Sequence, residues 1–209
     1  MKHRHIVVEG AIGSGKTSLA TRLAHKVGAS LLLEDPQANP FLPLFYRDMR
    51  RHALPTQLFF LFQRVDQLET LKQPDLFGKP TVADFSLAKD PLFARLTLDD
   101  AEYQLYNKIY EHVRPQVPVP DLMVYLQAPI ETLVYRVKKR GMAMEAGISE
   151  DYLRSLSDAY TRYFYDYGDS PLLIVNSENL NFVDKPEHFE MLVERMGSIR
   201  GGREFFNLR

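Results

Sequence analysis

The chain has 209 residues, of which 45% are hydrophobic and 25% are charged. This length and balance fit one globular α/β domain and exclude a disordered or fibrous chain. The 26 Lys and Arg offset 27 Asp and Glu, and the resulting net charge of -1 provides no field for binding a nucleic-acid backbone. We therefore expect neither DNA nor RNA as a partner.

The cysteine content and the apolar runs bear on where the protein works. The sequence has no Cys, which excludes disulfides and Cys-based zinc sites and suits a reducing cytoplasm. The apolar run at residues 6–8 is too short for the core of a signal peptide. No window approaches the roughly 20 apolar residues of a membrane span. We expect a cytoplasmic protein that has no membrane partner.

The hydrophobic pattern predicts strands that alternate with helices. The expected strands are residues 5–9, 31–33, 81–83, 122–126 and 172–175. The expected helices are residues 16–27, 44–51, 56–72, 99–113, 130–140 and 149–167. The continuous apolar run at 31–33 is typical of a parallel strand that is covered on both faces. The tail at residues 197–209 contains Gly201 and Gly202, and we expect it to be frayed.

This order of elements predicts a doubly wound, five-stranded parallel sheet with helices on both faces, in one domain spanning residues 1–209. A basic run that ends the helix at 130–140 predicts a short lid at about residues 136–147. Arg136 and Arg140 are four residues apart on one helix face, where they would place cations over a transferring phosphoryl group. The alternative is an ordinary solvated helix terminus whose cations interact favourably with the helix dipole.

A glycine-rich loop follows the first predicted strand and precedes the first predicted helix, and it fits the pattern G-x-x-x-x-G-K-[ST]. Such a loop curls so that its backbone N–H groups point at phosphate oxygens. Lys16 would neutralise the β- and γ-oxygens of ATP, and the Thr17 hydroxyl would bind Mg²⁺. The predicted ATP-binding residues are Gly10, Ala11, Ile12, Gly13, Ser14, Gly15, Lys16, Thr17 and Ser18.

A phosphate loop alone does not choose among GTPase switches, motors and small-molecule kinases. The sequence has no Asp-x-x-Gly after the third predicted strand and no later Asn-Lys-x-Asp, which argues against a regulatory GTPase. It also has no hydrophobic run that ends in adjacent acids, as a motor ATPase would usually have. A small-molecule kinase is therefore the class that remains.

Two carboxylates are placed for kinase chemistry. Glu34 and Asp84 each follow an apolar strand, and ligands of open α/β sheets bind outside the carboxyl ends of the strands. One carboxylate can take the proton of an attacking hydroxyl while the other helps to hold Mg²⁺. The alternative for each is a solvated acid at the end of a strand.

With these features in place, the chain resembles the deoxyribonucleoside kinase family from about Ile6 to Val175. The segments that carry the resemblance are GAIGSGKTS, NPFLPLFYRD, TQLFFLFQR, DFSLAKDPLFA, PDLMVYLQAP and RVKKRGMAMEAGISEDYL. The resemblance implies the P-loop NTPase fold, usually as a homodimer. It also implies ATP-dependent phosphorylation of the 5′-hydroxyl of a deoxyribonucleoside in nucleoside salvage.

The resemblance also implies roles for individual side chains. Glu34 corresponds to the general base, and Asp84 to the acidic member of an acid-Arg-Ser motif. Further implied roles are the sugar 3′-hydroxyl for Tyr46 and Glu145, the base edge for Gln57, base-side orientation for Arg64, and the ATP phosphates for Arg136 and Arg140.

Two positions depart from the family pattern. Phe85 stands where many members have Arg, and Met142 stands where the lid usually carries a further Arg. Each change removes a cation, so two other functions stay open: another small-molecule P-loop kinase, and a catalytically weak nucleotide-binding homologue with a regulatory role. The preferred nucleoside also stays open, because the Gln57 amide offers a donor and an acceptor and can pair with several bases.

Overall fold

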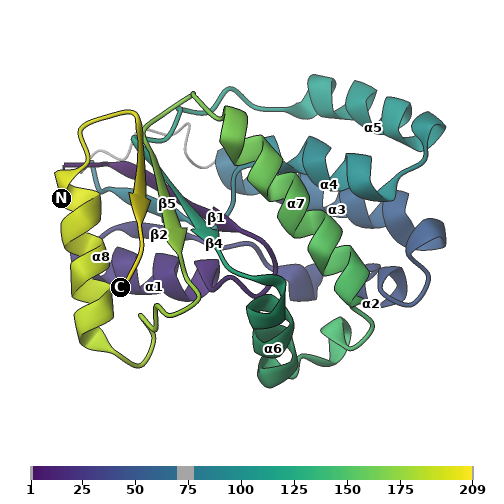
Figure 1. The fold of residues 1–209 in the computed structure, drawn as a ribbon. Helices are drawn as coiled ribbons and strands as arrows, with labels where there is room; N and C mark the ends of the chain where they lie inside the picture. The colour runs from purple at the N-terminus through teal and green to yellow at the C-terminus, as the bar shows by residue number, and fades with distance from the viewer. Residues whose placement is uncertain (1, 70–77, 209) are drawn as a thin grey trace.

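A computed structural model describes residues 2–69 and 78–208. Its centre is a parallel sheet of six strands in the order β2-β3-β1-β4-β5-β6 (Figure 1). The strands are β1 His5–Gly10, β2 Ser30–Leu32, β3 Thr81–Ala83, β4 Leu122–Gln127, β5 Leu172–Asn176 and β6 Arg203–Phe206. Helices cover both faces, which confirms the doubly wound α/β fold that the alternating pattern predicts.

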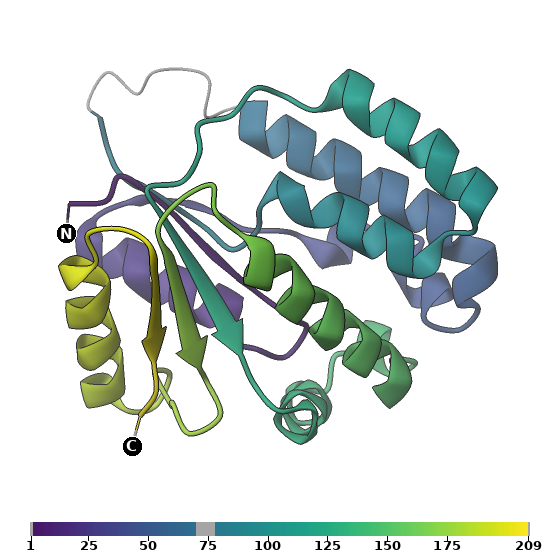
Figure 2. The same cartoon turned by 45° about the horizontal axis from the view of Figure 1, so that its top comes forward.

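The helices form two unequal layers (Figure 2). One face of the sheet packs against α1 (Lys16–Val27) and α8 (Pro186–Ser198). The other face packs against α4 (Asp90–Thr97) and α7 (Glu150–Asp166). Beyond α4 lie α2 (Leu42–Phe45), α3 (Met49–Glu69) and α5 (Asp100–Val113), while α6 (Ile130–Arg140) follows β4 at the carboxyl end of the sheet.

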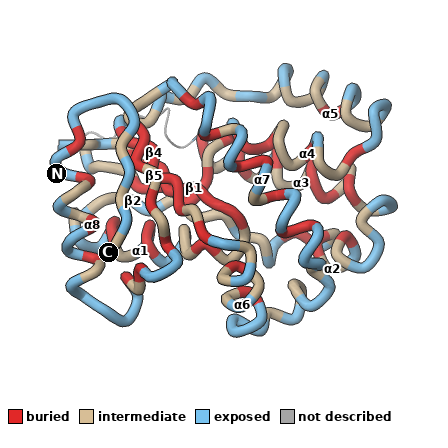
Figure 3. The backbone as a smooth tube through the Cα atoms, viewed as in Figure 1, coloured by how far each residue is buried: buried red, intermediate tan, exposed pale blue. Residues whose placement is uncertain are grey.

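The central strands bury side chains on both faces because successive residues of a strand point to opposite sides. In β1, Ile6 and Val8 join the cluster formed with α1 and α8, whereas Val7 joins the cluster formed with α7. Figure 3 shows this burial running through β1 and β4 at the middle of the molecule. The sheet is thus a fixed platform whose strand ends carry the site.

A third apolar cluster fills the space among α2, α3 and α5 and supports one wall of the site. Its fully buried large side chains include Phe45, Leu61 and Tyr106. Phe85 belongs to the same cluster and is only 1% exposed. Phe85, which stands where many family members have the Arg of the acid-Arg-Ser motif, is therefore a core residue.

The predicted strand count and the predicted tail were wrong. The tail forms β6, which pairs with β5 in the register Leu172↔Arg203. Phe206 packs against the α1 and α8 side of the core, and this contact together with the edge of β5 orders the segment. The predicted strand at 31–33 is also not covered on both faces, because β2 is an edge strand with exposed and partly exposed residues.

Two predicted helix boundaries needed correction as well. The predicted helix at 44–51 is divided between α2, which ends at Phe45, and α3, which begins at Met49. The second predicted helix is part of α3, which continues through Pro55, and residues 70–72 of that prediction lie outside the described residues. Pro55 lacks the backbone N–H of a helix interior, but the burial of Ala53 and Leu61 in the third cluster keeps the helix continuous.

Within residues 2–69 and 78–208, no helix combines the length and the apolar character that crossing a bilayer requires.

Candidate active site

The phosphate loop connects β1 to α1, as the motif predicts. Gly10, Gly13 and Gly15 have φ angles of 155°, 87° and 96°, in a region that side-chain-bearing residues rarely adopt. A Cβ atom at Gly10 would lie 2.6 Å from the carbonyl oxygen of Leu126. The loop can therefore curl closely over the end of the sheet only because glycine occupies these positions, and α1 starts directly after it at Lys16.

The ends of β1, β2 and β3 bring the loop and the two predicted carboxylates together. The Asp84 carboxylate accepts a hydrogen bond from the Thr17 hydroxyl at 2.5 Å and another from the Glu34 backbone N–H at 2.8 Å. Asp84 thus links the first turn of α1 to Glu34, two residues beyond the end of β2. This arrangement agrees with the expectation that Glu34 and Asp84 face one crevice.

A cavity of about 410 Å³ opens beside these residues. It has the size of a small-molecule site. Its lining residues come from the phosphate loop, the strand ends, α2, α3, α4 and the lid, and they include Lys16, Thr17, Ser18, Glu34, Tyr46, Gln57, Arg64, Asp84, Lys89, Arg140, Met142 and Glu145.

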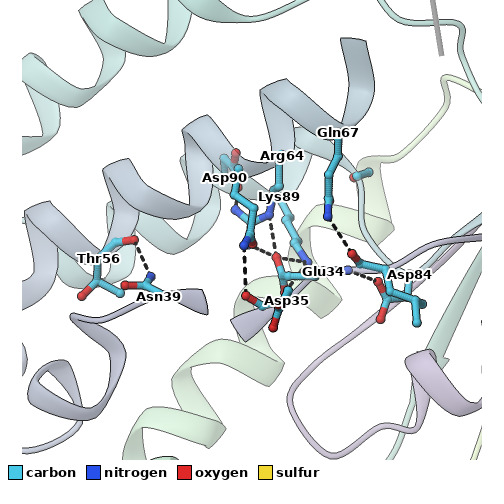
Figure 4. A network of polar contacts seen from close by, with 12 residues as sticks. Glu34, Asp35, Asn39, Thr56, Arg64, Gln67, Asp84, Lys89 and Asp90 are labelled. Carbon is cyan, nitrogen blue, oxygen red and sulfur yellow. Dashed lines mark hydrogen bonds and ion pairs between the residues drawn. The ribbon is translucent and has the colours of Figure 1, made fainter. Parts of the chain in front are cut away.

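Glu34 is the most strongly perturbed carboxylate of this cavity. Its side chain is 12% exposed, and Arg64 donates to its Oε1 from Nε at 2.6 Å and also from Nη2. The Lys89 Nζ atom lies 3.4 Å from Oε2 (Figure 4). Burial by itself raises the pKa of Glu34, but Arg64, Lys89 and Lys16 outweigh it and lower the pKa to about 2. Glu34 is therefore an ionised acceptor at neutral pH.

Arg64 is held between two acids in the interior. Its guanidinium contacts Glu34 on one side and forms an ion pair with the fully buried Asp90 on the other. The ring of Phe60 lies 5.0 Å from the guanidinium carbon. A planar guanidinium with two acidic partners is rigidly oriented, so it fixes Glu34 from the side of the helical layer.

Three buried charged residues escaped the sequence interpretation: Glu9, Lys89 and Asp90. Glu9 accepts hydrogen bonds from the Ser86 N–H at 2.6 Å and the Tyr160 hydroxyl at 3.1 Å, and it lies 3.9 Å from the Lys89 ammonium. A charged residue directly after the apolar run of β1, and still within the strand, was one available signal. The adjacent charges at 89 and 90, shortly after β3, were another.

Gln57 is buried in α3 with its amide orientation fixed. Its Nε2 lies 3.2 Å from the hydroxyl oxygen of Thr97, and that hydroxyl donates to the Phe93 carbonyl at 2.8 Å. Because Thr97 uses its proton elsewhere, it accepts from the Gln57 amide nitrogen. The amide oxygen and the second amide N–H then remain for the cavity, which Gln57 lines together with Phe60 and Phe93.

The lid lies against Tyr46. Arg140 forms an ion pair with Glu145, in which its Nε donates at 3.1 Å. Burial, followed by Tyr152 and Glu145, raises the pKa of Tyr46, so this hydroxyl keeps its proton. At Gly147 a Cβ atom would lie only 2.7 Å from the Tyr46 carbonyl oxygen. Tyr46 and Glu145, predicted to act on one sugar hydroxyl, thus line the same cavity.

The two predicted lid arginines point to different places. Arg136 donates to the carbonyl oxygen of Ser14 at 3.3 Å and to that of Ser177 at 2.6 Å, and it lines a second cavity of about 910 Å³ beside the phosphate loop. Arg140 lines both cavities, and Met142 lines the one that contains Glu34. Only Arg140 of the pair is therefore shared between the two cavities.

The oxygen atoms of Thr17 and Asp84 fit a magnesium ion that is bound partly by a nucleotide. Mg²⁺ prefers oxygen ligands and is usually held by one or two carboxylates together with phosphates and water. Across the described parts of the chain, no group of three His, Cys, Asp or Glu is placed to hold a metal ion. Thr17 and Asp84 could therefore supply only part of the oxygen ligands of such an ion.

Comparison with known proteins places this geometry in a family. The family model for deoxynucleoside kinase matches residues 6–199. A deoxyguanosine kinase of Bacillus subtilis (strain 168) is 33% identical over 192 residues, which cover 90% of this chain and 93% of that protein. A deoxyadenosine kinase of Lactobacillus acidophilus is 32% identical over 192 residues, which cover 85% of this chain and 87% of that protein.

Solved structures agree with the sequence relatives. The deoxyadenosine kinase from M. mycoides with bound dATP has a TM-score of 0.80 at 26% identity, and the match covers 94% of this chain and 100% of that one. The same enzyme with the products dCMP and a flexible dCDP bound has a TM-score of 0.79 at 25% identity, over 93% and 99% of the two chains. The chain belongs to the deoxynucleoside kinase family.

Proposed function

We propose that this protein transfers the γ-phosphoryl group of ATP to the 5′-hydroxyl of a deoxyribonucleoside. The observation that carries the proposal is the position of Glu34, a buried and ionised carboxylate that opens onto the same cavity as Lys16 and Thr17 of the phosphate loop. A general base for the acceptor hydroxyl and a binding loop for the donor phosphates would thus line the same cavity. Membership of the deoxynucleoside kinase family supports the same reaction.

In this reaction the acceptor oxygen attacks the γ-phosphorus, and the bond from that phosphorus to the bridging oxygen of ADP breaks. Glu34 accepts the proton that the 5′-hydroxyl loses. Negative charge spreads over the oxygens of the transferring group, and Lys16 and Arg140 are the cations of the cavity that would stabilise it. Arg136 would add positive charge on the far side of the phosphate loop.

Magnesium would be held by Thr17 and Asp84, whose oxygen atoms are already in contact. When bound, the ion neutralises phosphate oxygens of the nucleotide. Asp84 also accepts the Glu34 N–H, so it keeps the general base next to the metal-binding residues.

The nucleoside would lie deeper in the cavity, with its sugar toward α2 and the lid and its base toward α3. Tyr46 and Glu145 would hydrogen-bond the sugar 3′-hydroxyl. Gln57 would pair with the base through the amide oxygen and the second N–H that Thr97 leaves available. Arg64 would orient that edge of the pocket.

The expected homodimer and the expected cytoplasmic location belong to the same proposal. The family resemblance supports the homodimer, and a sequence without Cys suits the cytoplasm. Light scattering of the purified protein at several concentrations measures the oligomeric state. Fractionation of cells that express the tagged chain measures the location.

A nucleoside panel tests the proposed function. Ligands that bind only the native state raise the melting temperature, so each deoxynucleoside is added with ADP and Mg²⁺ and compared with other phosphate acceptors. The best ligand is then assayed for nucleoside monophosphate formed from ATP. A larger shift with a non-nucleoside acceptor would favour another small-molecule kinase, and tight binding without turnover would favour the regulatory homologue.

Replacing Gln57 with alanine should impair nucleoside selection more than ATP binding. The change leaves a base edge without partners in a buried pocket, at a cost of about 1 to 3 kcal/mol, while the phosphate loop is untouched. KM values for ATP and for each nucleoside measure this difference. Gln104→Ala, on the exposed face of α5, is the matched control. An equal loss of ATP affinity would move the base site away from Gln57.

An arginine in place of Met142 should raise kcat. Met142 lines the cavity together with Arg140, so a guanidinium there would add a cation near the transferring group, where charge develops in the transition state. Turnover, the KM for ATP and the melting temperature of Met142→Arg are compared with those of Met191→Arg, whose exposed side chain lies on α8. A variant that melts lower and turns over no faster would show that Met142 serves packing alone.

A further inference from the structure

Lys89 has an unusual place for a lysine. It ends the short helical turn Leu87–Lys89 that follows β3, and its side chain is only 3% exposed. A buried ammonium is costly unless anionic partners compensate for its lost hydration. Its Nζ lies 3.4 Å from Glu34 and 3.9 Å from Glu9, while the rings of Phe85 and Phe93 lie 6.0 Å away. Lys89 also lines the reaction cavity, so this cation stands between two acids at the site.

The two acids belong to different halves of the reaction. Glu9 directly precedes Gly10, the first residue of the phosphate loop, and its carboxylate is fixed by the Ser86 N–H and the Tyr160 hydroxyl. Glu34 follows β2 and is the proposed general base on the acceptor side. The Lys89 ammonium therefore connects Glu9, at the start of the phosphate loop, to Glu34, the proposed general base.

Arg64 cannot replace this bridge. Arg64 reaches Glu34 from α3, in the helical layer, and its second partner is Asp90. Arg64 contacts only Oε1 of Glu34, whereas the Lys89 Nζ atom lies 3.4 Å from both Oε1 and Oε2 (Figure 4). Phe85 is buried in the helical core and brings no charge. Among the described residues, Lys89 is the cation that ties Glu34 to the strand carrying the phosphate loop.

We propose that Lys89 is a positioning residue for phosphoryl transfer, whose ammonium bridges Glu9 and Glu34 and fixes the general base relative to the phosphate loop. Lys89 should therefore contribute to the rate of phosphoryl transfer and not to the affinity for nucleoside or ATP. An error of about 1 Å in placing a reacting group can cost on the order of 10²-fold in rate, while the groups that bind the nucleoside and ATP stay in place. This inference rests on the proposed kinase activity.

The decisive experiment removes the ammonium and then returns it. Lys89→Met keeps most of the side-chain volume and should lower kcat by about 10²-fold, with KM values for ATP and nucleoside within about threefold of the parent. Lys89→Ala should lose as much activity and leave a space beside the cavity. Methylammonium or ethylammonium should restore part of the kcat of Lys89→Ala with saturation, because either brings a small N–H-bearing cation back between the two carboxylates.

Two controls separate the positioning role of Lys89 from effects of ionic strength and from effects of losing any lysine. Tetramethylammonium at the same ionic strength carries charge without N–H donors, and it should not restore turnover. Lys108→Ala removes an exposed lysine of α5 and should show neither the loss nor the response to amines. Melting temperature and nucleoside binding of every variant are measured alongside the kinetics.

The results discriminate sharply. A Lys89→Met enzyme that keeps kcat within threefold of the parent would overturn the inference. So would a Lys89→Ala protein that loses nucleoside binding and kcat together and that no amine restores, because Lys89 would then act only in folding. Failure of the proposed function looks different, since the unmodified protein would then phosphorylate no nucleoside of the panel.

Discussion

Replacing Lys16 with alanine is expected to lower phosphoryl transfer by about 10³-fold or more and to leave the fold intact. Lys16 opens α1 directly after the glycine loop, and its side chain lines the reaction cavity, where it is partly exposed. In the proposed reaction this substitution removes the cation that would neutralise the β- and γ-phosphates as charge moves between them. The affected quantity is therefore kcat/KM for ATP, measured as nucleoside monophosphate formed.

The matched control lies on the same helix. Lys26 is exposed near the end of α1 and forms an ion pair with Glu190 at 2.8 Å, so Lys26→Ala removes a lysine of α1 that is remote from the site. Exposed pairs of this kind contribute little to stability, and the control should retain full turnover. Parental turnover in Lys16→Ala would instead remove the phosphate loop from the chemistry.

Features that depend on local sequence were predictable. The phosphate loop was readable because its glycines are required by a backbone geometry that few other residues adopt, and because a strand and a helix flank it. The carboxylates at 34 and 84 could be placed in one crevice because the ends of parallel strands meet at one edge of the sheet. The helix at Asp100–Val113 begins with a capping box of Asp99 and Glu102, a signal that lies within four residues of sequence.

Features that depend on distant contacts were not predictable in the same way. β6 forms because β5 offers an unpaired edge and because Phe206 packs against the apolar cluster beside α1 and α8. The sequence of the tail indicates neither of these contacts. The edge position of β2 likewise follows from the strand order. Local patterns do not report which strand is a neighbour of which.

The polar interior of the site illustrates the same limit. Arg64 and Glu34 are thirty residues apart in sequence, and Glu9 and Lys89 are eighty, yet each pair meets in the interior. Charge pairing across such distances leaves no periodic signal. The same holds for Arg136 and Arg140, which share a helix face in sequence but contact different partners, a backbone carbonyl of the phosphate loop and the lid carboxylate Glu145.

Replacing Glu34 with glutamine is expected to abolish kcat while nucleoside binding persists. The amide keeps the shape of the side chain, but it cannot take the proton of the 5′-hydroxyl, and general-base catalysis is worth about 10²- to 10⁴-fold. The loss should exceed this factor, because the neutral amide also releases Arg64 and Lys89 from the anion that holds them at the cavity. Single-turnover assays with saturating nucleoside and ATP measure the chemical step directly.

The same exchange has a signature in stability that depends on pH. Glu34 has its pKa lowered from 4.5 to about 2 by the neighbouring cations, so its ionised form stabilises the fold above about pH 4.5, and this contribution is lost as the pH falls toward 2. Glutamine carries no such contribution at any pH. The difference in melting temperature between the parent and Glu34→Gln should therefore be largest near neutrality and shrink in acid. The exchange Glu194→Gln, at an exposed position of α8 away from the cavity, serves as the control and should change neither kcat nor this difference. A Glu34→Gln enzyme whose kcat stays within a few fold of the parent would show that another group accepts the proton, and the proposed mechanism would have to be rebuilt around that group.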